Sequence, residues 1–354
     1  MRNNKLAVFV VTLSVFLFSC TKDDTPPVVP AVTTGVYVLN QGLYGNNNTS
    51  LTYYDFSTSA PTTDFFKNVN GFGLGDTGSD FIIYGSKTYV VVNVSGYVAV
   101  LNTATAKFTD TINFKKSGVN SGPQNIVASG KHVFVTATDG TVAVIDTVTL
   151  AIEKYITVGS NPAQMAVSGD NLYVSNTGGF SATYDSTVSV ISLNSLTVTA
   201  TITVGLNPGS IAADDAGNIY VACTGDYGSV APKLVKVALS SSSIIKTAAI
   251  AIGTIRFSKG QLLTTGGYLG AANVGLLNTT DLTAARAAFI TDGSTIVNPY
   301  GLDADPVTGD VYVGDAKDYV SSGEVFCFDK AGKKKFSFST NPGISPIRTQ
   351  LVIK

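Results

Sequence analysis

The chain has 354 residues, a formal net charge of −1 and 13% charged residues, with one histidine and no tryptophan. This balance, without a basic patch that carries interleaved aromatics, argues against a nucleic-acid partner. A single histidine cannot supply the multi-histidine sites of copper, haem or zinc enzymes. The 35 glycines, and aromatic residues that are all Tyr or Phe, indicate an all-β chain of many short strands and tight turns.

Residues 1–19 are typical of a secretory signal peptide. Arg2 and Lys5 come before the apolar run Leu6–Phe18, which is too short for a comfortable membrane span. The segment Leu17-Phe-Ser-Cys20 resembles a bacterial lipobox. We therefore expect the leader to be removed and Cys20 to become the lipidated N-terminus of an exported protein.

Residues 20–34 are polar and then rich in proline, which predicts an extended tether without packed structure. Lys22-Asp-Asp follows the lipidated cysteine closely and resembles the export signal of Bacteroidetes lipoproteins that reach the outer cell surface. An ordinary solvated linker is the alternative. The expected location is the outer membrane, with the acyl chains in the lipid and the folded part facing the cell exterior.

Residues 35–354 repeat one unit of four short strands. The copy Asn161–Gly205 has an Asn-Pro turn, a short apolar run, Tyr173-Val174 and two runs in which apolar residues alternate with polar ones. Turn-forming strand ends recur seven times at spacings of 40 to 51 residues, and an aromatic-Val pair recurs in six repeats, with Leu262-Leu263 in the remaining one. A four-stranded repeat of this length predicts a seven-bladed β-propeller.

The two ends of the repeat region are expected to share a blade. The first repeat, Gly35–Lys67, has only three strands, and the C-terminal segment Asn341–Ile353 contains an Asn-Pro turn and one further strand. This tail is predicted to supply the innermost strand of blade one, which leaves no open sheet edge.

The repeats resemble the YncE-like, or YVTN-repeat, propellers in runs such as GTVAVIDTVTL (Gly140–Leu150) and NPGSIAADDAGNIYVA (Asn207–Ala222). The segments Gly35–Asp55 and Leu74–Gly85 look like the opening blades of Bacteroidetes surface lipoproteins in that group. Among those lipoproteins are propellers that capture cobalamin above a TonB-dependent transporter. The resemblance covers the whole mature chain and implies capture of a corrinoid nutrient for such a transporter. It transfers no ligand-contacting residue to this sequence.

Two sets of loops converge at one end of a propeller channel, and both are recognisable here. Connections into the innermost strands carry prolines at positions 123, 162, 208, 299 and 342. Loops between the second and third strands are short at Thr138–Gly140 but longer than a hairpin needs in most blades. Long loops on one face are the natural place for function. The long ones are Gln41–Ser50, Thr177–Ser186, Thr224–Pro232, Gly266–Ala272 and Ala316–Gly323.

Aromatic rings among short polar residues in these loops suit a large, partly flat, polar ligand. Asparagines that recur after the second strand, and polar residues beside the proline turns, could point toward the channel mouth. The alternative is that the rings cap the blades and that blade turns demand the asparagines. The candidate ligand-binding residues are Asn40, Tyr44, Asn93, Gln124, Gln164, Asn176, Phe180, Tyr184, Asp226, Tyr227, Tyr268, Tyr300 and Tyr319.

The sequence offers no catalytic constellation, so we expect a binding protein rather than an enzyme, without metal or cofactor. The lone His132 is expected to be a structural or surface residue, and Cys223 and Cys327 to be small buried hydrophobes. Paired aspartates recur in loops, and turn chemistry explains them better than Ca²⁺ binding. These pairs are Asp76 and Asp80, Asp214 and Asp215, Asp303 and Asp305, and Asp315 and Asp318.

Two alternatives to nutrient capture stay open. A surface adhesin or scaffold would bind protein or glycan through the same face. A propeller lyase is disfavoured, because its chemistry depends on histidine and the chain has only one.

Overall fold

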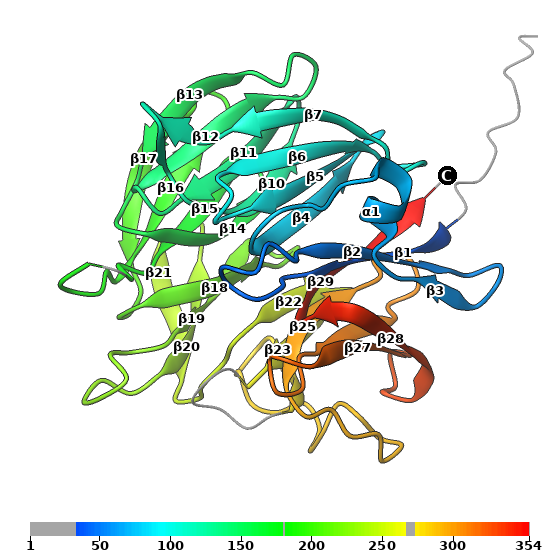
Figure 1. Ribbon diagram of the computed structural model, residues 1–354. Helices are drawn as coiled ribbons and strands as arrows, with labels where there is room; N and C mark the ends of the chain where they lie inside the picture. The colour runs from blue at the N-terminus through cyan, green and yellow to red at the C-terminus, as the bar shows by residue number, and fades with distance from the viewer. Residues whose placement is uncertain (1–32, 180, 267–272, 354) are drawn as a thin grey trace, which may run out of the picture. The chain divides into compact units, whose positions relative to one another are not determined.

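The computed structural model describes residues 33–353 apart from 180 and 267–272, and the chain from Thr33 onward forms one compact unit. The described residues form seven antiparallel sheets around a common channel, which confirms the all-β, seven-bladed propeller (Figure 1). They also contain a two-stranded hairpin and one short helix. No helix of this part of the chain is long and apolar enough to cross a membrane.

Blade one joins the two ends of the propeller domain, as the sequence predicted. The C-terminal strand β29 (Pro346–Ile353) is innermost and pairs antiparallel with β1 (Thr33–Asn40), with Gln350 opposite Tyr37. The sheet continues with β2 (Ser50–Asp55) and β3 (Ala60–Thr62) (Figure 1). The ring is therefore closed by backbone hydrogen bonds between strands that lie at opposite ends of the sequence.

Blades two to five have the predicted four strands, with the innermost strand first in sequence. Blade two contains β4 (Gly78–Tyr84), β5 (Lys87–Val92), β6 (Tyr97–Asn102) and β7 (Phe108–Asn113), and blade three contains β10 (Pro123–Ser129), β11 (His132–Ala137), β12 (Thr141–Asp146) and β13 (Ile152–Thr157). Blade four contains β14 (Pro162–Ser168), β15 (Asn171–Asn176), β16 (Thr187–Ser192) and β17 (Thr197–Thr203), and blade five contains β18 (Pro208–Ala213), β19 (Asn218–Cys223), β20 (Lys233–Ala238) and β21 (Ser243–Ala248).

Blade six has only three strands among the described residues, so the prediction of a fourth strand in this blade is wrong. Beyond its third strand the chain makes a single isolated bridge, between Leu277 and Ala284. Blade seven is complete. Blade six contains β22 (Ile255–Ser258), β23 (Gln261–Thr265) and β24 (Val274–Leu277). Blade seven contains β25 (Pro299–Ala304), β26 (Val311–Asp315), β27 (Ser322–Phe328) and β28 (Lys334–Ile344).

The core lies between neighbouring blades. Every residue of β11 is buried, whereas the outermost strand β13 of the same blade is mostly exposed. Val and Ile side chains of blades two and three pack into one cluster that includes Tyr89, Val91 and Val133. This gradient explains why second strands read as continuous apolar runs, while the outer strands carry polar side chains.

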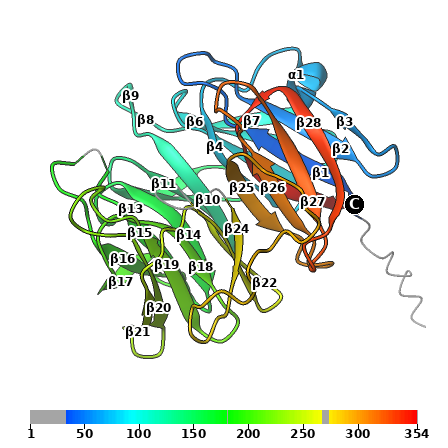
Figure 2. The same cartoon turned by 90° about the horizontal axis from the view of Figure 1, so that it is seen from below.

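Two elements were not foreseen. The helix α1 (Phe65–Asn70) follows β3; it buries Phe66 and ends at Gly71, whose left-handed conformation lets its N–H bond to the Lys67 carbonyl. The hairpin of β8 (Lys115–Lys116) and β9 (Val119–Asn120) lies between blades two and three (Figure 2). Both are local insertions in connections that the repeat pattern leaves free.

The last proline turn is at Pro346 and not at Pro342, which corrects the sequence expectation. Pro342 lies inside the long strand β28, and β29 begins at Pro346. Gly301 and Gly314 allow this turn, because a Cβ at either position would lie 2.6 Å or 2.1 Å from the Pro346 carbonyl oxygen.

The strand order gives the propeller two distinct faces. The loop face carries the connections into the innermost strands and the loops between second and third strands, such as residues 41–49 and 177–186. The turn face carries the connections between first and second strands, such as Gly85-Ser86 and Lys259-Gly260. Thr33 starts β1 at the turn face, since it pairs with Ile353 at the end of β29.

Candidate functional site

The mouth of the channel at the loop face is a cavity of about 260 Å³ with polar walls. Its lining comes from the first residues of the innermost strands, and Arg256 lies deeper among the lining residues. The polar lining residues are Ser79, Gln124, Asn125, Gln164, Thr254 and Tyr300. The predicted residues Gln124, Gln164 and Tyr300 are thus brought together at one cavity.

Side chains of neighbouring blades hold this mouth in place. Gln124 donates from Nε2 to Asn161 Oδ1 at 3.0 Å, and Ser210 donates to Gln164 Oε1 at 2.8 Å. Within the described part of the chain, the other side-chain amide atom of each residue, Gln124 Oε1 and Gln164 Nε2, has no hydrogen-bond partner. The mouth therefore presents both an amide acceptor and an amide donor to a ligand.

Two tyrosine pairs stand on the loop face. The Tyr184 and Tyr227 rings meet edge to face at 6.1 Å, and the Tyr300 and Tyr319 rings do so at 5.5 Å. The Tyr300 hydroxyl also donates to Gln41 Oε1 at 3.1 Å. Tyr44 is 81% exposed, and Tyr227, Tyr319 and Tyr184 are 52%, 47% and 36% exposed, so these rings are available for contact.

Two of the predicted asparagines do not reach the mouth. Asn40 and Asn176 are fully buried inside their blades. Each amino group donates to two hydroxyls of the third strand, those of Ser50 and Thr52 for Asn40. Asn176 makes the corresponding pair of bonds to Thr187 and Ser189. The expectation that they point into the channel mouth is therefore corrected, and the blade-turn alternative describes them.

The other candidates have separate positions. Asn93 donates to the Pro123 carbonyl at 2.8 Å and so supports the turn that enters β10. Asp226 accepts the N–H groups of Gly228 and Val230, which lowers its pKa and organises the loop that presents Tyr227. Phe180 and Tyr268 lie outside the described residues.

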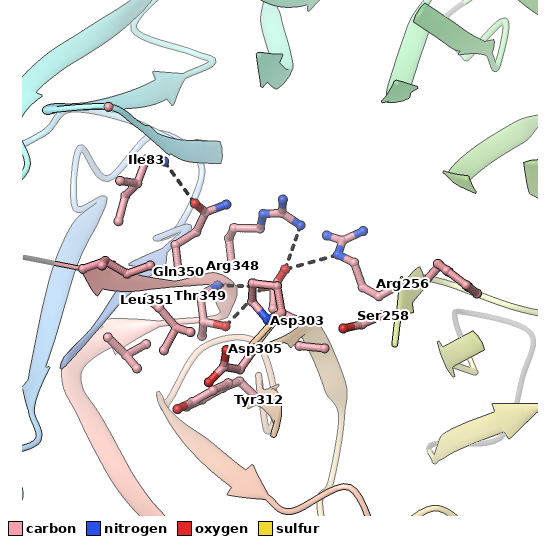
Figure 3. Close-up of a pocket in the computed structure, with 16 residues that line it drawn as sticks. Ile83, Arg256, Ser258, Asp303, Asp305, Tyr312, Arg348, Thr349, Gln350 and Leu351 are labelled. Carbon is pink, nitrogen blue, oxygen red and sulfur yellow. Dashed lines mark hydrogen bonds and ion pairs between the residues drawn. The ribbon is translucent and has the colours of Figure 1, made fainter. Parts of the chain in front are cut away.

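Four charged side chains of the innermost strands meet inside the channel. Asp303 of β25 lies between two arginines: its Oδ1 is 3.2 Å from Arg256 Nε and 2.8 Å from Arg348 Nη1 (Figure 3). Asp80 of β4 lies 3.2 Å from Arg348 Nε, close enough for an ion pair but not aligned as a hydrogen bond. The four side chains are only 11% to 21% exposed, so water screens these contacts weakly.

Burial governs the ionisation of this cluster. It raises the pKa of Asp80, although Arg348 and the Ile126 amide act in the opposite direction. Burial lowers the pKa of Arg256, and the positive charge of Arg348 lowers it further. Burial also opposes the charge of Arg348, but Asp303 and Asp80 raise its pKa. Arg348 therefore has two carboxylates beside it, Asp80 and Asp303, whereas Arg256 shares only Asp303.

A second and larger cavity, of about 540 Å³, opens at the turn face beyond this cluster. Arg256, Arg348 and Asp303 line it together with Gln350 and apolar residues of blades one, two, six and seven (Figure 3). Neither this cavity nor its two arginines were predicted from the sequence.

The charged cluster also corrects the reading of two aspartates. Turn chemistry is right for Asp76, Asp214, Asp305, Asp315 and Asp318, which accept backbone N–H groups of their own loops or of neighbouring loops. It is wrong for Asp80 and Asp303, which lie on innermost strands and pair with arginines. A usable signal was the rarity of arginine: the chain has four, and Arg256 and Arg348 each follow an isoleucine in an innermost strand.

The single histidine and the two described cysteines lie outside the innermost strands. His132 begins β11, and its Nε2 lies 2.9 Å from Glu153 Oε2, away from the channel-lining strands. Cys223 and Cys327 are free and buried, and burial raises the pKa of each thiol to about 12. Among the residues that the structure describes, no three His, Cys, Asp or Glu side chains are grouped to hold a metal ion.

Fold and channel define the class of this protein as a seven-bladed β-propeller with a cavity toward each end of the channel and a cluster of charged residues between them. The chain belongs to the family described as Domain of unknown function (DUF5074), whose model matches residues 34–341. No curated protein matches the sequence.

Solved structures of similar fold share few identical residues with this chain. A quinonprotein alcohol dehydrogenase-like protein from Bacteroides thetaiotaomicron VPI-5482 is 13% identical, with a TM-score of 0.65, and the match covers 90% of this chain and 78% of that one. Kuenenia stuttgartiensis hydrazine synthase is 18% identical, with a TM-score of 0.58 and coverage of 72% and 76%. The computationally designed Ika8 protein is 11% identical, with a TM-score of 0.59 and coverage of 91% and 92%. These likenesses show the propeller fold alone.

Proposed function

We propose that this chain is a lipid-anchored propeller of the outer cell surface that binds a large polar ligand on its loop face without catalysis. A cobalamin-like corrinoid is the leading ligand, and a TonB-dependent transporter of the outer membrane is the partner that would receive it. The observation that carries the proposal is the arrangement of two tyrosine pairs, in which Tyr184, Tyr227 and Tyr319 are exposed, on the face where an amide-lined mouth opens.

The geometry supports a ligand that lies across the loop face. A cavity of about 260 Å³ is too small for a whole corrinoid but can accept one of its peripheral groups. A corrinoid carries amide side chains around a broad macrocycle, and Gln124 and Gln164 offer a complementary acceptor and donor at the mouth. Tyrosine rings supply wide contact area at a low entropic cost.

The point at which the chain enters the propeller fits surface capture. Thr33 begins β1 at the turn face, opposite the long loops. A lipid anchor at Cys20 would therefore be joined to the propeller on the face away from the tyrosines.

Equilibrium titration with cyanocobalamin, followed by absorbance, tests the proposal. Tyr184→Ala and Tyr227→Ala should each weaken binding about tenfold, since loss of a contact aromatic costs on the order of 1–2 kcal/mol. Tyr155→Ala is the matched control: Tyr155 is as exposed as Tyr184, at 36%, but lies on the outermost strand β13. Its variant should bind like the parent protein.

The proposal of corrinoid capture is lost if the folded chain binds no cyanocobalamin at micromolar concentrations. It is also lost if the Tyr155 variant is weakened as much as the loop variants. Capture of a protein or glycan through the same loops, without any corrinoid binding, would instead favour an adhesin.

A further inference from the structure

The turn-face cavity is built from parts that are far apart in the sequence. It combines apolar side chains such as Val36, Ile83 and Leu351 with the polar groups of Arg256, Arg348 and Gln350. Arg256 comes from β22, and Arg348 and Gln350 come from β29; in Figure 3 the two guanidinium groups meet at Asp303 and the Gln350 amide faces Ile83. The cavity of about 540 Å³ lies toward the end of the channel opposite the tyrosine loops, and Arg256 is the one lining residue that it shares with the mouth of the proposed function.

The acceptors of this cavity are already occupied. Asp303 Oδ1 accepts from Arg256 Nε and forms an ion pair with Arg348 Nη1, and Oδ2 accepts from the Thr349 N–H at 2.7 Å and the Thr349 hydroxyl at 3.2 Å. Gln350 Oε1 accepts from the Ile83 N–H at 3.0 Å. Asp305 caps its own turn by accepting from the Val307 N–H. A ligand would find few free acceptors here.

The donors of the cavity are not all used. Arg256 donates from Nε to Asp303 and from Nη1 to the Ile255 carbonyl, whereas Arg348 Nη1 forms an ion pair with Asp303. Among the described residues, the remaining Nη2 groups of both arginines and the Gln350 amino group have no hydrogen-bond partner. None of these three groups is enclosed without contact to solvent. The cavity therefore offers planar N–H donors beside an apolar wall.

We propose that the turn-face cavity binds a small organic acid, with its carboxylate against Arg256 and Arg348 and its apolar part against Ile83 and Leu351. Flat guanidinium groups match a carboxylate in geometry as well as charge. The apolar wall favours an acid with a hydrocarbon body over inorganic phosphate. The low pKa of Arg256, caused by burial and by Arg348, agrees with a place for added negative charge.

The probe is 4-phenylbutyrate, added to the full chain and compared with its neutral amide and with inorganic phosphate. The chain has four arginines, so their side-chain Nε–H signals in a nitrogen-15 NMR spectrum are few enough to assign. Phenylbutyrate should shift the Arg256 and Arg348 signals at concentrations of up to about 10 mM, as expected for a ligand of this size. The Arg286 signal should stay in place, because Arg286 lies outside the cavity and bonds to the Ala331 carbonyl.

The amide and phosphate should each bind about tenfold more weakly than the acid, because one lacks the charge and the other lacks the apolar body. Unmoved Arg256 and Arg348 signals would overturn the proposal. Equal responses to acid and amide would overturn the role of the arginines, and equal responses to acid and phosphate would overturn the assignment to an organic acid.

Two variants keep the test independent of folding. Arg256→Lys retains a positive charge near Asp303 but removes the planar donor, and it should weaken phenylbutyrate binding about tenfold. Gln350→Glu retains an oxygen for the Ile83 N–H but replaces the free donor by a negative charge, and it should weaken binding at least as much. Arg286→Lys is the control and should bind like the parent chain. Cyanocobalamin affinity should be unchanged in Gln350→Glu, since Gln350 does not line the mouth. Unchanged phenylbutyrate binding in both cavity variants would overturn the proposal.

Discussion

The two ends of the channel are built by different physical means. At the loop face, neutral amides and hydroxyls of adjacent blades bond to one another, and exposed tyrosines stand on the surrounding loops. At the turn face, the cavity depends on buried ions that converge from four blades. The first end can change its loops without affecting the core, whereas the second shares its charged residues with the closure of the ring.

This difference follows from the energies of the two kinds of contact. A neutral hydrogen bond contributes about 1 kcal/mol net, and its loss at a solvated mouth is tolerated. A buried ion that loses its partner costs several kcal/mol. The loop face is therefore suited to variation in ligand, and the charged cluster acts as a fixed floor between the two cavities.

Deletion of Asn341–Lys354 gives the largest expected effect, because it breaks both ends at once. The deletion removes β29, which pairs with β1 and supplies Ile347 to the mouth and Arg348 to the cluster. An exposed edge would remain, and the buried Asp80 carboxylate would lose its arginine partner. We expect aggregation or loss of cooperative thermal unfolding, measured by calorimetry. A chain that ends at Val352 is the control and should unfold cooperatively; an unchanged transition in the longer deletion contradicts the closure.

Asp303→Ala should separate the two ends by their energies. It leaves two buried guanidinium groups without their shared carboxylate and should lower the free energy of unfolding by about 3–5 kcal/mol. Gln124→Ala removes one neutral hydrogen bond at the mouth and should cost about 1 kcal/mol. Urea denaturation measures both. The exposed Asp110→Ala is the control and should leave the midpoint nearly unchanged. Similar losses for Asp303→Ala and Gln124→Ala would remove the distinction.

The sequence predicted the loop face because its features are local. Proline turns at positions 123, 162, 208 and 299 mark the entry to innermost strands, and loop length marks the gap between second and third strands. These signals placed Gln124, Gln164 and Tyr300 at one mouth. They failed at Pro342 because Pro346, four residues later, also follows a polar residue, and the strand β28 continues through Pro342.

The charged cluster was not predictable from local features. Positions 80, 256, 303 and 348 come together only when the ring closes, and no repeat period relates their side chains. The prediction that the two buried asparagines point into the mouth failed for another reason. A shift of one residue along a strand moves a side chain to the other side of the sheet. Asn40 and Asn176 each face a Ser or Thr pair of the next strand, Ser50 and Thr52 or Thr187 and Ser189, and this pairing was the available signal.

The smallest expected effect is a difference in titration between the two regions. Asp318, in the loop of Tyr319, accepts the N–H groups of Val320 and Ser321, and these bonds lower its pKa to about 2. Its contribution to stability is therefore complete above the unfolded pKa, near 3.8, and is lost as the pH falls through about 2. Asp80, in the charged cluster, responds in the opposite sense, because burial raises its pKa above 3.8.

For Asp80 the folded state binds the proton more tightly than the unfolded state, so protonation of this one group favours folding as the pH falls through its raised pKa. Carbon-13 NMR of the side-chain carboxyl groups, from about pH 6 to about pH 2, measures both titrations. Asp80 should protonate first, and the Arg348 Nε–H signal should move with it because the ion pair between them weakens. Asp318 should stay ionised until the acid end of the range. The reverse order would mean that Arg348 outweighs burial at Asp80, and the floor of the channel would then be held by charge as firmly in acid as at neutral pH.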